Sequence, residues 1–446
     1  MTYEEARAFI GEANQYGSKL GLETVTELLR RLDNPQERLR IIHVGGTNGK
    51  GSTSAFIACI LAAEGYLTGR YNSPSVFSYR EKIRLSFRGD YNVRTHRQSE
   101  VPEIYHEEIT KKGVGDAAAL IKAACEAMVR DGFPHPTSFE IETAMAYLYL
   151  AEAGVDYAVI EVGMGGRLDA TNTVNKPVCS VITSVSMDHM QFLGDTLKKI
   201  TAEKAGIIKK GVPAVTCNKD PEVLQVLYET ARQSETRLIL ADISEAEEVR
   251  YTDHGTAFYY RGEEYKLQLL GEYQMQNALL AIRTAEVLRE EGCKLSDAAI
   301  KAGLLQAKWS GRLEILAREP LLVVDGAHNE DAAVQLRKAV ELYFKDRRIL
   351  FILGVLADKD YTAILRIMAP LAQVIITVTP DNPRALEASR LAEEAAAYCP
   401  GRIVAAGSTL HAVNTAYELA EKEDVILAFG SLSYLREIKR AVSTGD

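Results

Sequence analysis

The chain has 446 residues, of which 47% are hydrophobic and 25% charged, and its net charge is −9. These proportions are typical of a globular protein with more than one domain, and the acidic balance argues against a nucleic-acid binder or a polybasic membrane tail. The longest unbroken apolar run, 55–63, is too short to cross a bilayer, and the acidic N-terminus is unlike a secretory signal. Six cysteines without a C-x-x-C pair predict reduced thiols, and we therefore expect a cytoplasmic protein. From the charge and the short apolar runs we expect no nucleic-acid or membrane partner.

Short β-branched runs alternate with longer helical patterns, which predicts parallel α/β sheets. The predicted strands are 41–44, 157–162, 178–185, 212–217, 321–325, 349–354, 374–378 and 424–430. Helical patterns such as 139–153 and 330–343 lie between them. From 237 to 270 the pieces are shorter and alternate, and we expect 256–260 and 265–269 to form an antiparallel hairpin at the edge of the first sheet.

A domain boundary is expected where one helical pattern ends and a new strand–helix series begins, near Trp309. We therefore predict a first α/β domain at 1–308, a hinge at 309–312 and a smaller, Rossmann-like α/β domain at 313–446.

The strongest local motif follows the predicted strand 41–44. Glycines, a lysine and a hydroxyl lead into a helical pattern, and this arrangement favours polyphosphate binding through backbone N–H groups, a helix N-terminus and a cation. The loop departs from G-x-x-x-x-G-K-[ST], because Val44 replaces the first glycine and Gly51 separates Lys50 from Ser52. It nevertheless predicts a P-loop ATPase domain, in which the ATP-binding residues are Thr47, Asn48, Gly49, Lys50, Gly51 and Ser52.

Two further strand ends carry polar side chains. Glu161 lies at the end of one predicted strand, and His189 follows the next strand along the chain. Because carboxyl ends of parallel strands share a sheet edge, we expect the two side chains to lie in a common site. The spacing of Glu161 and His189 alone would suggest that this site transfers protons. Lys204 precedes a glycine at a helix end and could simply be a solvated lysine paired with Glu203.

The loop and seven further motifs resemble the folate branch of the Mur-ligase superfamily, which comprises folylpolyglutamate synthase and the bifunctional dihydrofolate synthase. The resemblance spans nearly the whole chain. Its motifs are Leu20-Gly21-Leu22-Glu23, Ser73-Pro74, the run from Glu161 to Asp169, Asp188-His189, Glu203-Lys204-Ala205-Gly206, Gly311-Arg312 and the run from Asp325 to Asn329.

The resemblance implies roles for residues that spacing alone leaves open. It implies that Ser73, Glu161 and His189 bind Mg²⁺, with two ions expected, and that Lys204 is carbamylated. Asn277 would contact adenine rather than be a helix-surface amide, and Arg312 and Asp325 would reach ATP, although Asp325 could instead cap the following helix. His328 and Ser431 would bind the incoming glutamate, and Lys50, Lys204 and His328 would be the catalytic residues.

The resemblance also implies a pterin site made of three pieces. Its residues are Leu20, Gly21, Phe139, Glu140, Leu168, Asp169 and Ala170. A carboxylate at Asp169 could accept paired hydrogen bonds from a pterin, or it could be an ordinary cap of the loop before Thr171. A basic stretch from Arg80 to Arg97 could bind a polyglutamate tail or be a solvated loop.

We therefore expect a monomeric, ATP-dependent amide ligase that activates a carboxylate as an acyl phosphate and joins it to L-glutamate. The expected substrates are dihydropteroate and reduced folates. The alternatives are a folylpolyglutamate synthase only, a Mur-type cell-wall ligase, a P-loop regulatory or motor ATPase, and a non-catalytic nucleotide-binding protein. The cell-wall alternative is disfavoured because Gly51, not threonine, follows Lys50.

Overall fold

The computed structural model of the chain describes residues 1–17, 21–89, 103–187, 190–252 and 255–443. The chain forms two compact units. The first comprises Met1–Glu248, Phe258–Leu267 and Tyr273–Ala307, and the second comprises Val249–Ala257, Gln268–Glu272 and Lys308–Asp446. The last segment of the second unit thus begins one residue before the predicted hinge at 309–312, and two short earlier segments also belong to the second unit. The hinge role stays a prediction.

The first unit is built on an eight-stranded sheet in the order β4-β3-β2-β5-β1-β6-β7-β8. Neighbouring strands from β2 to β8 are parallel, whereas β3 and β4 form an antiparallel edge. The strands are β1 (Ile41–Gly45), β2 (Thr68–Tyr71), β3 (Ile83–Arg88), β4 (Ile104–Glu108), β5 (Tyr157–Glu161), β6 (Cys179–Ile182), β7 (Ala214–Thr216) and β8 (Leu238–Leu240). The expected parallel sheet with a small antiparallel edge is present, but β3 and β4 form that edge instead of the predicted hairpin.

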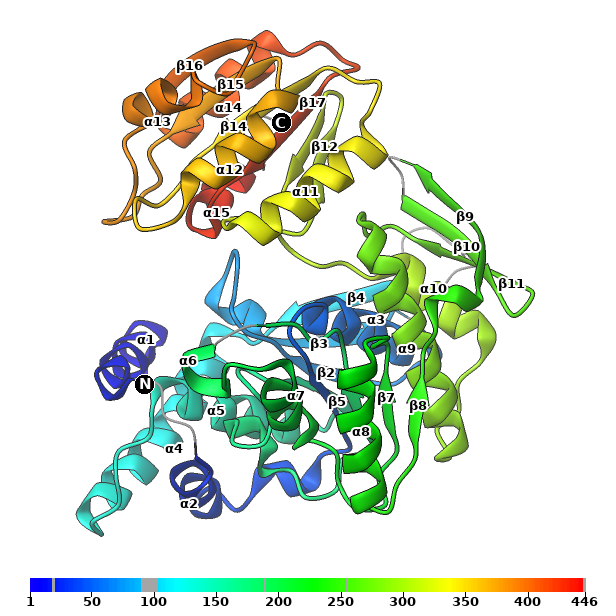
Figure 1. The fold of residues 1–446 in the computed structure, drawn as a ribbon. Coiled ribbons are helices and arrows are strands. Elements are labelled where there is room, and N and C mark those ends of the chain that lie inside the picture. The colour runs from blue at the N-terminus through cyan, green and yellow to red at the C-terminus, as the bar shows by residue number, and fades with distance from the viewer. Residues whose placement is uncertain (18–20, 90–102, 188–189, 253–254, 444–446) are drawn as a thin grey trace. The chain divides into compact units, whose positions relative to one another are not determined.

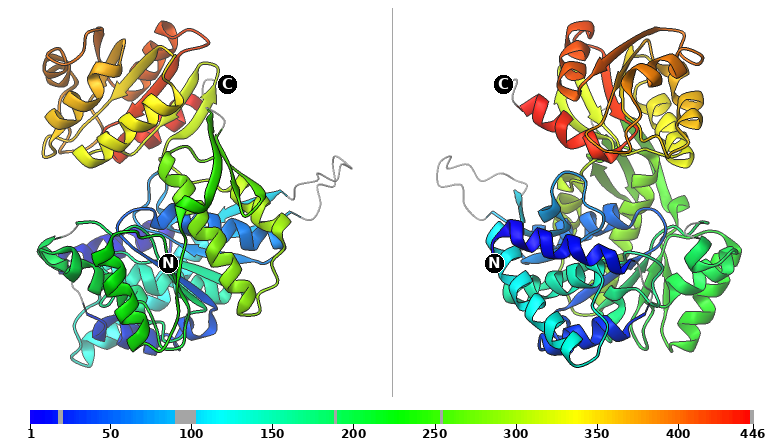
Figure 2. Two further views of the ribbon diagram at one scale, coloured as in Figure 1. Left: turned by 45° about the vertical axis from the view of Figure 1, so that its right-hand side comes forward. Right: turned by 90° about the vertical axis from the view of Figure 1, so that its left-hand side faces the viewer.

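Helices cover this sheet (Figures 1 and 2). The helix that follows β1 packs against β1, β2, β3 and β5 and is covered in turn by α10. Residues of α1, α2, α4 and α5 form one apolar core with Ile41, Ala158 and Ile160 of the sheet. The helices are α1 (Tyr3–Glu12), α2 (Glu23–Arg31), α3 (Lys50–Glu64), α4 (Lys111–Arg130), α5 (Ser138–Glu152), α6 (Met190–Leu193), α7 (Leu197–Ala205), α8 (Pro221–Gln233), α9 (Glu272–Glu290) and α10 (Asp297–Gln306).

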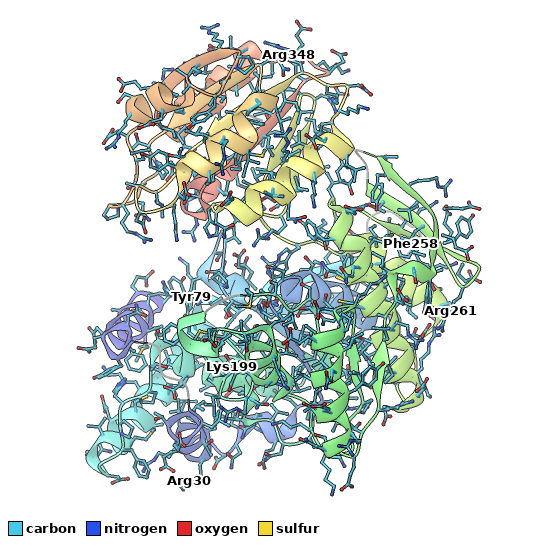
Figure 3. The ribbon with its side chains drawn as sticks, viewed as in Figure 1. Arg30, Tyr79, Lys199, Phe258, Arg261 and Arg348 are labelled. Carbon is cyan, nitrogen blue, oxygen red and sulfur yellow. The ribbon has the colours of Figure 1, made fainter. Side chains whose placement is uncertain are left out.

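The predicted hairpin exists, but its predicted place was wrong. Strands β9 (Ala246–Thr252), β10 (Gly255–Tyr260) and β11 (Glu263–Leu267) form a separate three-stranded sheet and do not extend the first one. Arg261 and Gly262, at φ of 52° and 82°, make the two-residue turn between β10 and β11 (Figure 3). The outer strands of the first sheet are β4 and β8, and the hairpin pairs with β9 instead of with either of them.

The second unit contains a six-stranded sheet in the order β12-β13-β17-β14-β15-β16, parallel except for the antiparallel pair β12–β13. Its strands are β12 (Glu314–Arg318), β13 (Leu321–Val324), β14 (Ile349–Leu353), β15 (Val374–Val378), β16 (Arg402–Gly407) and β17 (Val425–Phe429). Its helices are α11 (Glu330–Tyr343), α12 (Tyr361–Met368), α13 (Ala388–Ala395), α14 (Thr409–Leu419) and α15 (Leu432–Ser443). This doubly wound arrangement confirms the second, smaller α/β domain.

All six cysteines are free thiols, and five of them are buried. In the part of the chain that the structure describes, every helix is too short or too polar to span a bilayer.

Candidate active site

The P-loop connects β1 to α3 and needs glycine at two positions. Gly46 and Gly49 adopt φ of 140° and 87°, which other residues rarely adopt. An added Cβ would lie 1.9 Å from Thr183 Oγ1 at Gly46 and 2.3 Å from Asn277 Oδ1 at Gly49. The loop is therefore packed against two polar side chains from other parts of the first unit.

The segment after β6 holds this loop from one side. The Thr47 amide donates to the Ser184 carbonyl at 2.7 Å, and the Ser184 hydroxyl donates to the Asn48 carbonyl at 3.1 Å. The Ser186 amide donates to Thr47 Oγ1 at 3.1 Å. These bonds leave the predicted loop residues in a defined conformation, with Gly51 and Ser52 buried at the first turn of α3.

Two lysines converge on the loop. Lys50 Nζ donates to the carbonyl oxygens of Gly46 and Thr47, each at 3.1 Å. Lys204, in the last turn of α7, is 2% exposed and donates to the same Gly46 oxygen at 3.0 Å. The alternative that Lys204 is a solvated lysine is wrong, because its side chain is buried, and Glu203 pairs with Arg167.

Glu161 ends β5, directly beside β1, and is 5% exposed. Asn72 Nδ2 donates to its Oε2 at 2.6 Å, and the Ser73 backbone N–H also favours its charged form. Burial raises the pKa of Glu161, and the nearby charge of Lys50 opposes that rise. The structure thus brings Glu161 and Ser73 together next to the P-loop. The third predicted metal ligand, His189, lies outside the described residues.

These oxygen donors fit Mg²⁺. A divalent cation beside a buried carboxylate would offset the desolvation that disfavours its charged form. Within residues 1–17, 21–89, 103–187, 190–252 and 255–443, no cluster of three or more His, Cys, Asp or Glu side chains is placed to hold a metal. Mg²⁺ requires no such cluster, because it commonly uses one or two carboxylates, water and substrate phosphates.

Asn277 and Gln274 lie in the first turns of α9, close to the P-loop. Asn277 is 5% exposed and donates from Nδ2 to Gln274 Oε1 at 3.1 Å, so it is not a helix-surface amide. The Gln274 Nε2 atom is buried and has no hydrogen-bond partner within the described residues. Two amide side chains at the rim of the loop suit the predicted contact with a base.

The segment 163–172 is clamped to the end of α7 that carries Lys204. The Arg167 amide donates to the Glu203 carbonyl at 2.7 Å, and the Arg167 guanidinium pairs with the Glu203 carboxylate at 2.8 Å. Asn172 Nδ2 donates to the carbonyls of Arg167 and Gly206. A Cβ added at Gly166 would lie 2.6 Å from the Glu203 carbonyl oxygen. Two motifs forty residues apart are therefore one structural piece.

The predicted pterin residues gather around this same segment. The Gly21 amide donates to the Leu168 carbonyl at 3.3 Å, and Ala170 is buried. The Phe139 ring lies under Gly163, where an added Cβ would be 2.3 Å from Cζ. Leu20 lies outside the described residues.

The two acidic pterin candidates are engaged inside the chain. Glu140 forms a capping box with Thr137, accepting bonds from its amide at 2.7 Å and its hydroxyl at 2.8 Å. Asp169 accepts the amides of Met164 and Thr171 at 2.8 and 3.0 Å and the Thr171 hydroxyl at 2.5 Å. The structure therefore shows the loop-cap geometry for Asp169, and direct contact of either carboxylate with a pterin stays a prediction.

The predicted residues of the second unit form a cluster of their own. Asp325 follows β13 and accepts the amides of Leu313 at 2.9 Å and Ala327 at 2.8 Å. Burial raises its pKa, and the charge of Arg312 is the largest opposing effect. Asp325 is therefore not the helix cap, a role that Asn329 fills by accepting the Ala332 amide.

His328 and Ser431 lie beside this cluster. His328 Nδ1 is 2.7 Å from the Gly326 carbonyl, so Nδ1 is the protonated nitrogen of the neutral ring and Nε2 is an acceptor. Ser431 is buried at the end of β17, which pairs with β13. Arg312, Asp325, His328 and Ser431 thus share one edge of the second sheet.

The basic stretch is not the solvated loop that one alternative expected. Arg80 pairs with Glu108, Lys82 with Glu142, and Arg84 with Glu81. These side chains lie on or just before β3 and are mostly neutralised within the first unit. Arg94 and Arg97 lie outside the described residues.

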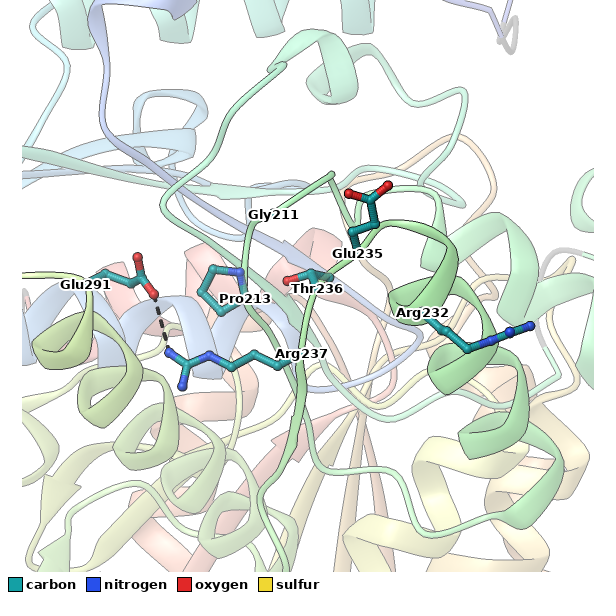
Figure 4. Close-up of a pocket in the computed structure, with 7 residues that line it drawn as sticks. All are labelled: Gly211, Pro213, Arg232, Glu235, Thr236, Arg237 and Glu291. Carbon is teal, nitrogen blue, oxygen red and sulfur yellow. Dashed lines mark hydrogen bonds and ion pairs between the residues drawn. The ribbon is translucent and has the colours of Figure 1, made fainter.

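A surface pocket of the first unit is lined by Gly211, Pro213, Arg232, Glu235, Thr236, Arg237 and Glu291 (Figure 4). Pro213 precedes β7 and Arg237 precedes β8, so the pocket lies at the amino-terminal ends of parallel strands. The P-loop and Glu161 lie at the carboxyl ends, which is the opposite edge. Arg237 is paired with Glu290 and Glu291, so this pocket does not resemble a phosphate site.

Sequence reasoning missed Asn72, Gln274 and the 183–186 segment. Asn72 directly precedes Ser73-Pro74, and 183–186 directly follows β6. β2 was not predicted, and the predicted strand 178–185 ran past the end of β6, so no signal in the sequence indicated that either segment follows a strand.

Comparisons with known proteins agree with this geometry. The family model described as "Mur ligase middle domain" matches residues 106–285, and "Mur ligase, glutamate ligase domain" matches 311–432. The dihydrofolate synthase/folylpolyglutamate synthase of Bacillus subtilis is 34% identical over 452 residues, covering 98% of both chains.

Two solved structures share the fold. A folylpolyglutamate synthase from Thermotoga maritima has a TM-score of 0.83 at 31% identity, covering 100% of this chain and 97% of that one. A Mycobacterium tuberculosis folylpolyglutamate synthase complexed with ADP and AMPPCP has a TM-score of 0.78 at 28% identity, covering 99% and 98%. This chain therefore belongs to the dihydrofolate synthase/folylpolyglutamate synthase family of Mur ligases.

Proposed function

We propose that this ATP-dependent ligase joins L-glutamate to the carboxylate of dihydropteroate and to the γ-carboxylate of reduced folates, through an acyl phosphate. The observation that supports this most is the assembly of the P-loop, Glu161 and the 163–172 segment in one unit. A phosphoryl-transfer site and a candidate pterin loop are there joined through the helix end that carries Lys204.

The P-loop residues Thr47, Asn48, Gly49, Lys50, Gly51 and Ser52 would hold the phosphates of ATP. The loop amides and the N-terminus of α3 favour anionic oxygens, and the Lys50 ammonium already lies on the loop. Asn277 would contact the adenine. A carboxylate oxygen of the substrate attacks the γ-phosphorus, the bond to ADP breaks, and an acyl phosphate forms.

Glu161, Ser73 and His189 would hold Mg²⁺, and the family resemblance implies two ions. When bound, Mg²⁺ supplies positive charge to the transferring phosphoryl group. Lys204 is buried within hydrogen-bond distance of the Gly46 carbonyl, where a carbamate would place an anion near the metal.

The second half-reaction would use residues of the second unit. His328 and Ser431 would bind glutamate, and Arg312 and Asp325 would contact the nucleotide. The His328 Nε2 acceptor could take the proton that the glutamate amine loses when it attacks the acyl carbonyl and phosphate leaves. We propose that both units serve this one reaction, and that the enzyme acts as a cytoplasmic monomer.

The decisive experiment measures ADP release with ATP and Mg²⁺ against separate carboxylates, with and without glutamate. Dihydropteroate, tetrahydrofolate and a nucleotide-sugar peptide would be compared. Glutamate-dependent ADP release with the two pterins, and none with the nucleotide-sugar peptide, is expected. ADP release that needs no carboxylate or amine would instead support a regulatory or motor ATPase, and no release with any substrate would support a non-catalytic protein.

A further inference from the structure

His43 is a fully buried histidine in the middle of β1, two residues before Gly45. Its neighbours on the strand, Ile42 and Val44, are apolar, and β1 lies between β5 and β6 in the sheet. Burial lowers the pKa of His43 to about 3, so the ring is neutral at ordinary pH. A neutral imidazole in such a place is costly unless its polar atoms have partners.

His43 has one hydrogen-bond partner in the described residues. Its Nε2 lies 2.9 Å from Thr171 Oγ1, while its Nδ1 is buried without a partner. The Thr171 hydroxyl donates its only proton to Asp169 Oδ1 at 2.5 Å. The hydroxyl must therefore accept from His43, which fixes the hydrogen on Nε2.

The chain of bonds continues into the candidate substrate loop. Asp169 Oδ1 also accepts the Thr171 amide, and Oδ2 accepts the Met164 amide at 2.8 Å. Tyr147 of α5 donates from its hydroxyl to the Thr171 carbonyl at 2.8 Å. Asp169 thus joins the two ends of the segment 164–171 through hydrogen bonds. His43 orients the Thr171 hydroxyl, which donates one of these bonds.

We propose that His43 is a positioning residue for the substrate loop 163–172, acting through the Thr171 hydroxyl on Asp169. The identity of the ligand that this loop binds, a pterin that carries a carboxylate, rests on the proposed function, whereas the positioning role of His43 does not. His43 touches no reacting atom in this arrangement. Its effect should appear in the binding of the carboxylate substrate.

Loss of the His43 imidazole should have little effect on the P-loop. The backbone of β1 is held by ladders to β5 and β6 on both sides. The P-loop itself is bonded to the 184–186 segment rather than to the His43 ring. Loss of the imidazole should therefore loosen the 164–171 part of the loop, which keeps its bonds to Glu203 and Gly206, and leave Thr47 to Lys50 in place.

The test compares His43→Leu, which removes the donor, with His43→Gln, whose amide nitrogen can reach Thr171 as Nε2 does. Loss of a hydrogen bond in a network that contains a charged group changes an equilibrium constant roughly tenfold or more. We expect His43→Leu to raise the KM for dihydropteroate or tetrahydrofolate about tenfold and to leave the KM for ATP within about twofold. His43→Gln should recover most of the loss.

Hydrogen exchange gives a second measurement that needs no substrate. His43→Leu should speed exchange in peptides covering 163–172 and leave peptides covering 45–52 unchanged. Thr171→Val, which removes the hydroxyl alone, should behave in the same way and serves if His43→Leu does not fold. Unchanged exchange in 163–172, or equal changes in both regions, would overturn the proposal. Wild-type protein that uses no pterin would refute the proposed function, whereas the exchange result would still decide the role of His43.

Discussion

Lys50 and Lys204 donate hydrogen bonds to the same oxygen atom, the backbone carbonyl of Gly46. One lysine begins α3 and the other ends α7, so the P-loop receives two ammonium groups from separate helices. Two like charges at one buried carbonyl repel, and an anion placed between them would relieve that repulsion. A polyphosphate at the loop, or a carbamate on Lys204, would supply such an anion.

Lys50→Ala should abolish turnover while leaving the fold intact. Removing one oriented electrostatic donor costs roughly 10²–10³ in rate, and the Lys50 side chain contributes hydrogen bonds rather than apolar packing. Lys199→Ala is the matched control, because Lys199 is an exposed lysine of α7 paired only with Asp195 in the described contacts. Steady-state ADP release measures both variants. Activity above a tenth of the wild-type rate in Lys50→Ala would remove Lys50 from the mechanism.

Lys204→Ala should lose activity and recover part of it with added acetate, because the missing group in the proposed enzyme is an anion. Lys204→Arg keeps a cation in place of the anion and should not be rescued. The direct measurement is the intact mass of the active enzyme under CO₂, together with the carbamate signal in ¹³C NMR. Active enzyme with an unmodified Lys204 would show that the carbamate is not needed.

The sequence was sufficient for most of the buried strands that have a predominantly apolar sequence. β1, β5, β14, β15 and β17 are predominantly apolar, and each begins and ends within about two residues of its predicted bounds. Edge strands were missed, and so was the interior strand β2, whose sequence TGRY is not apolar. β3 mixes arginines with apolar residues and β4 contains two glutamates, so neither gives a clear apolar pattern.

The candidate site was predictable where a motif follows a buried strand, as at the P-loop and Glu161. Direct ligand roles for Glu140 and Asp169 were harder to judge, because each carboxylate also suits a local cap. Thr137-x-x-Glu140 is a capping box visible in the sequence, and the structure forms it. The pairing of Arg84 with Glu108 depends on the register between β3 and β4, which the sequence does not reveal.

Glu161→Gln should raise the Mg²⁺ concentration needed for half-maximal activity. An amide keeps the shape and the Asn72 contact but removes the negative charge that would hold the cation. Titration of ADP release with Mg²⁺ measures the change, and removal of the metal with EDTA should stop the wild-type enzyme. Glu142→Gln is the control, since that carboxylate pairs with Lys82 instead. Identical Mg²⁺ curves for the wild type and Glu161→Gln would exclude Glu161 as a ligand.

The first unit should lose stability in acid through His43. Its pKa is about 3 when folded and about 6.5 when unfolded, so below pH 6.5 only the unfolded state binds the proton. The stabilising contribution is complete above pH 6.5 and declines by about 1.4 kcal/mol per pH unit as the pH falls toward 3. Lys209, the charged group that acts on His43, is a cation and supports the same direction.

Pulse proteolysis in urea at pH 6.5 and 4.5 measures this contribution in the first unit. The stability difference between wild type and His43→Gln should shift by about 2–3 kcal/mol over that interval, because glutamine does not titrate. A constant difference at the two pH values would mean that His43 is protonated in the folded protein.

We expect a substitution at Asp169 to affect the two activities that the family resemblance implies to different extents. We expect the enzyme to form dihydrofolate from dihydropteroate and glutamate, and also to extend reduced folates. Dihydropteroate has its reacting carboxylate close to the pterin, whereas a folate has a glutamate between them. To bring both carboxylates to one γ-phosphate, the two pterins must lie at different places. The loop that Asp169 closes with Met164 and Thr171 is where we place the shorter substrate.

Asp169→Ala should therefore reduce kcat/KM for dihydropteroate more than for tetrahydrofolate. Asp169→Asn should fall between alanine and the wild type, because one amide oxygen can still accept from Thr171 while the NH₂ group faces the Met164 amide. Opening of the loop should affect mainly the substrate that the loop holds. A general loss of stability would instead lower both activities equally, and the melting temperature of the variant distinguishes the two cases. If the purified wild type extends tetrahydrofolate but releases no ADP with dihydropteroate and glutamate, the protein is a folylpolyglutamate synthase only. If Asp169→Ala loses both activities equally at unchanged stability, both pterins bind at the same loop.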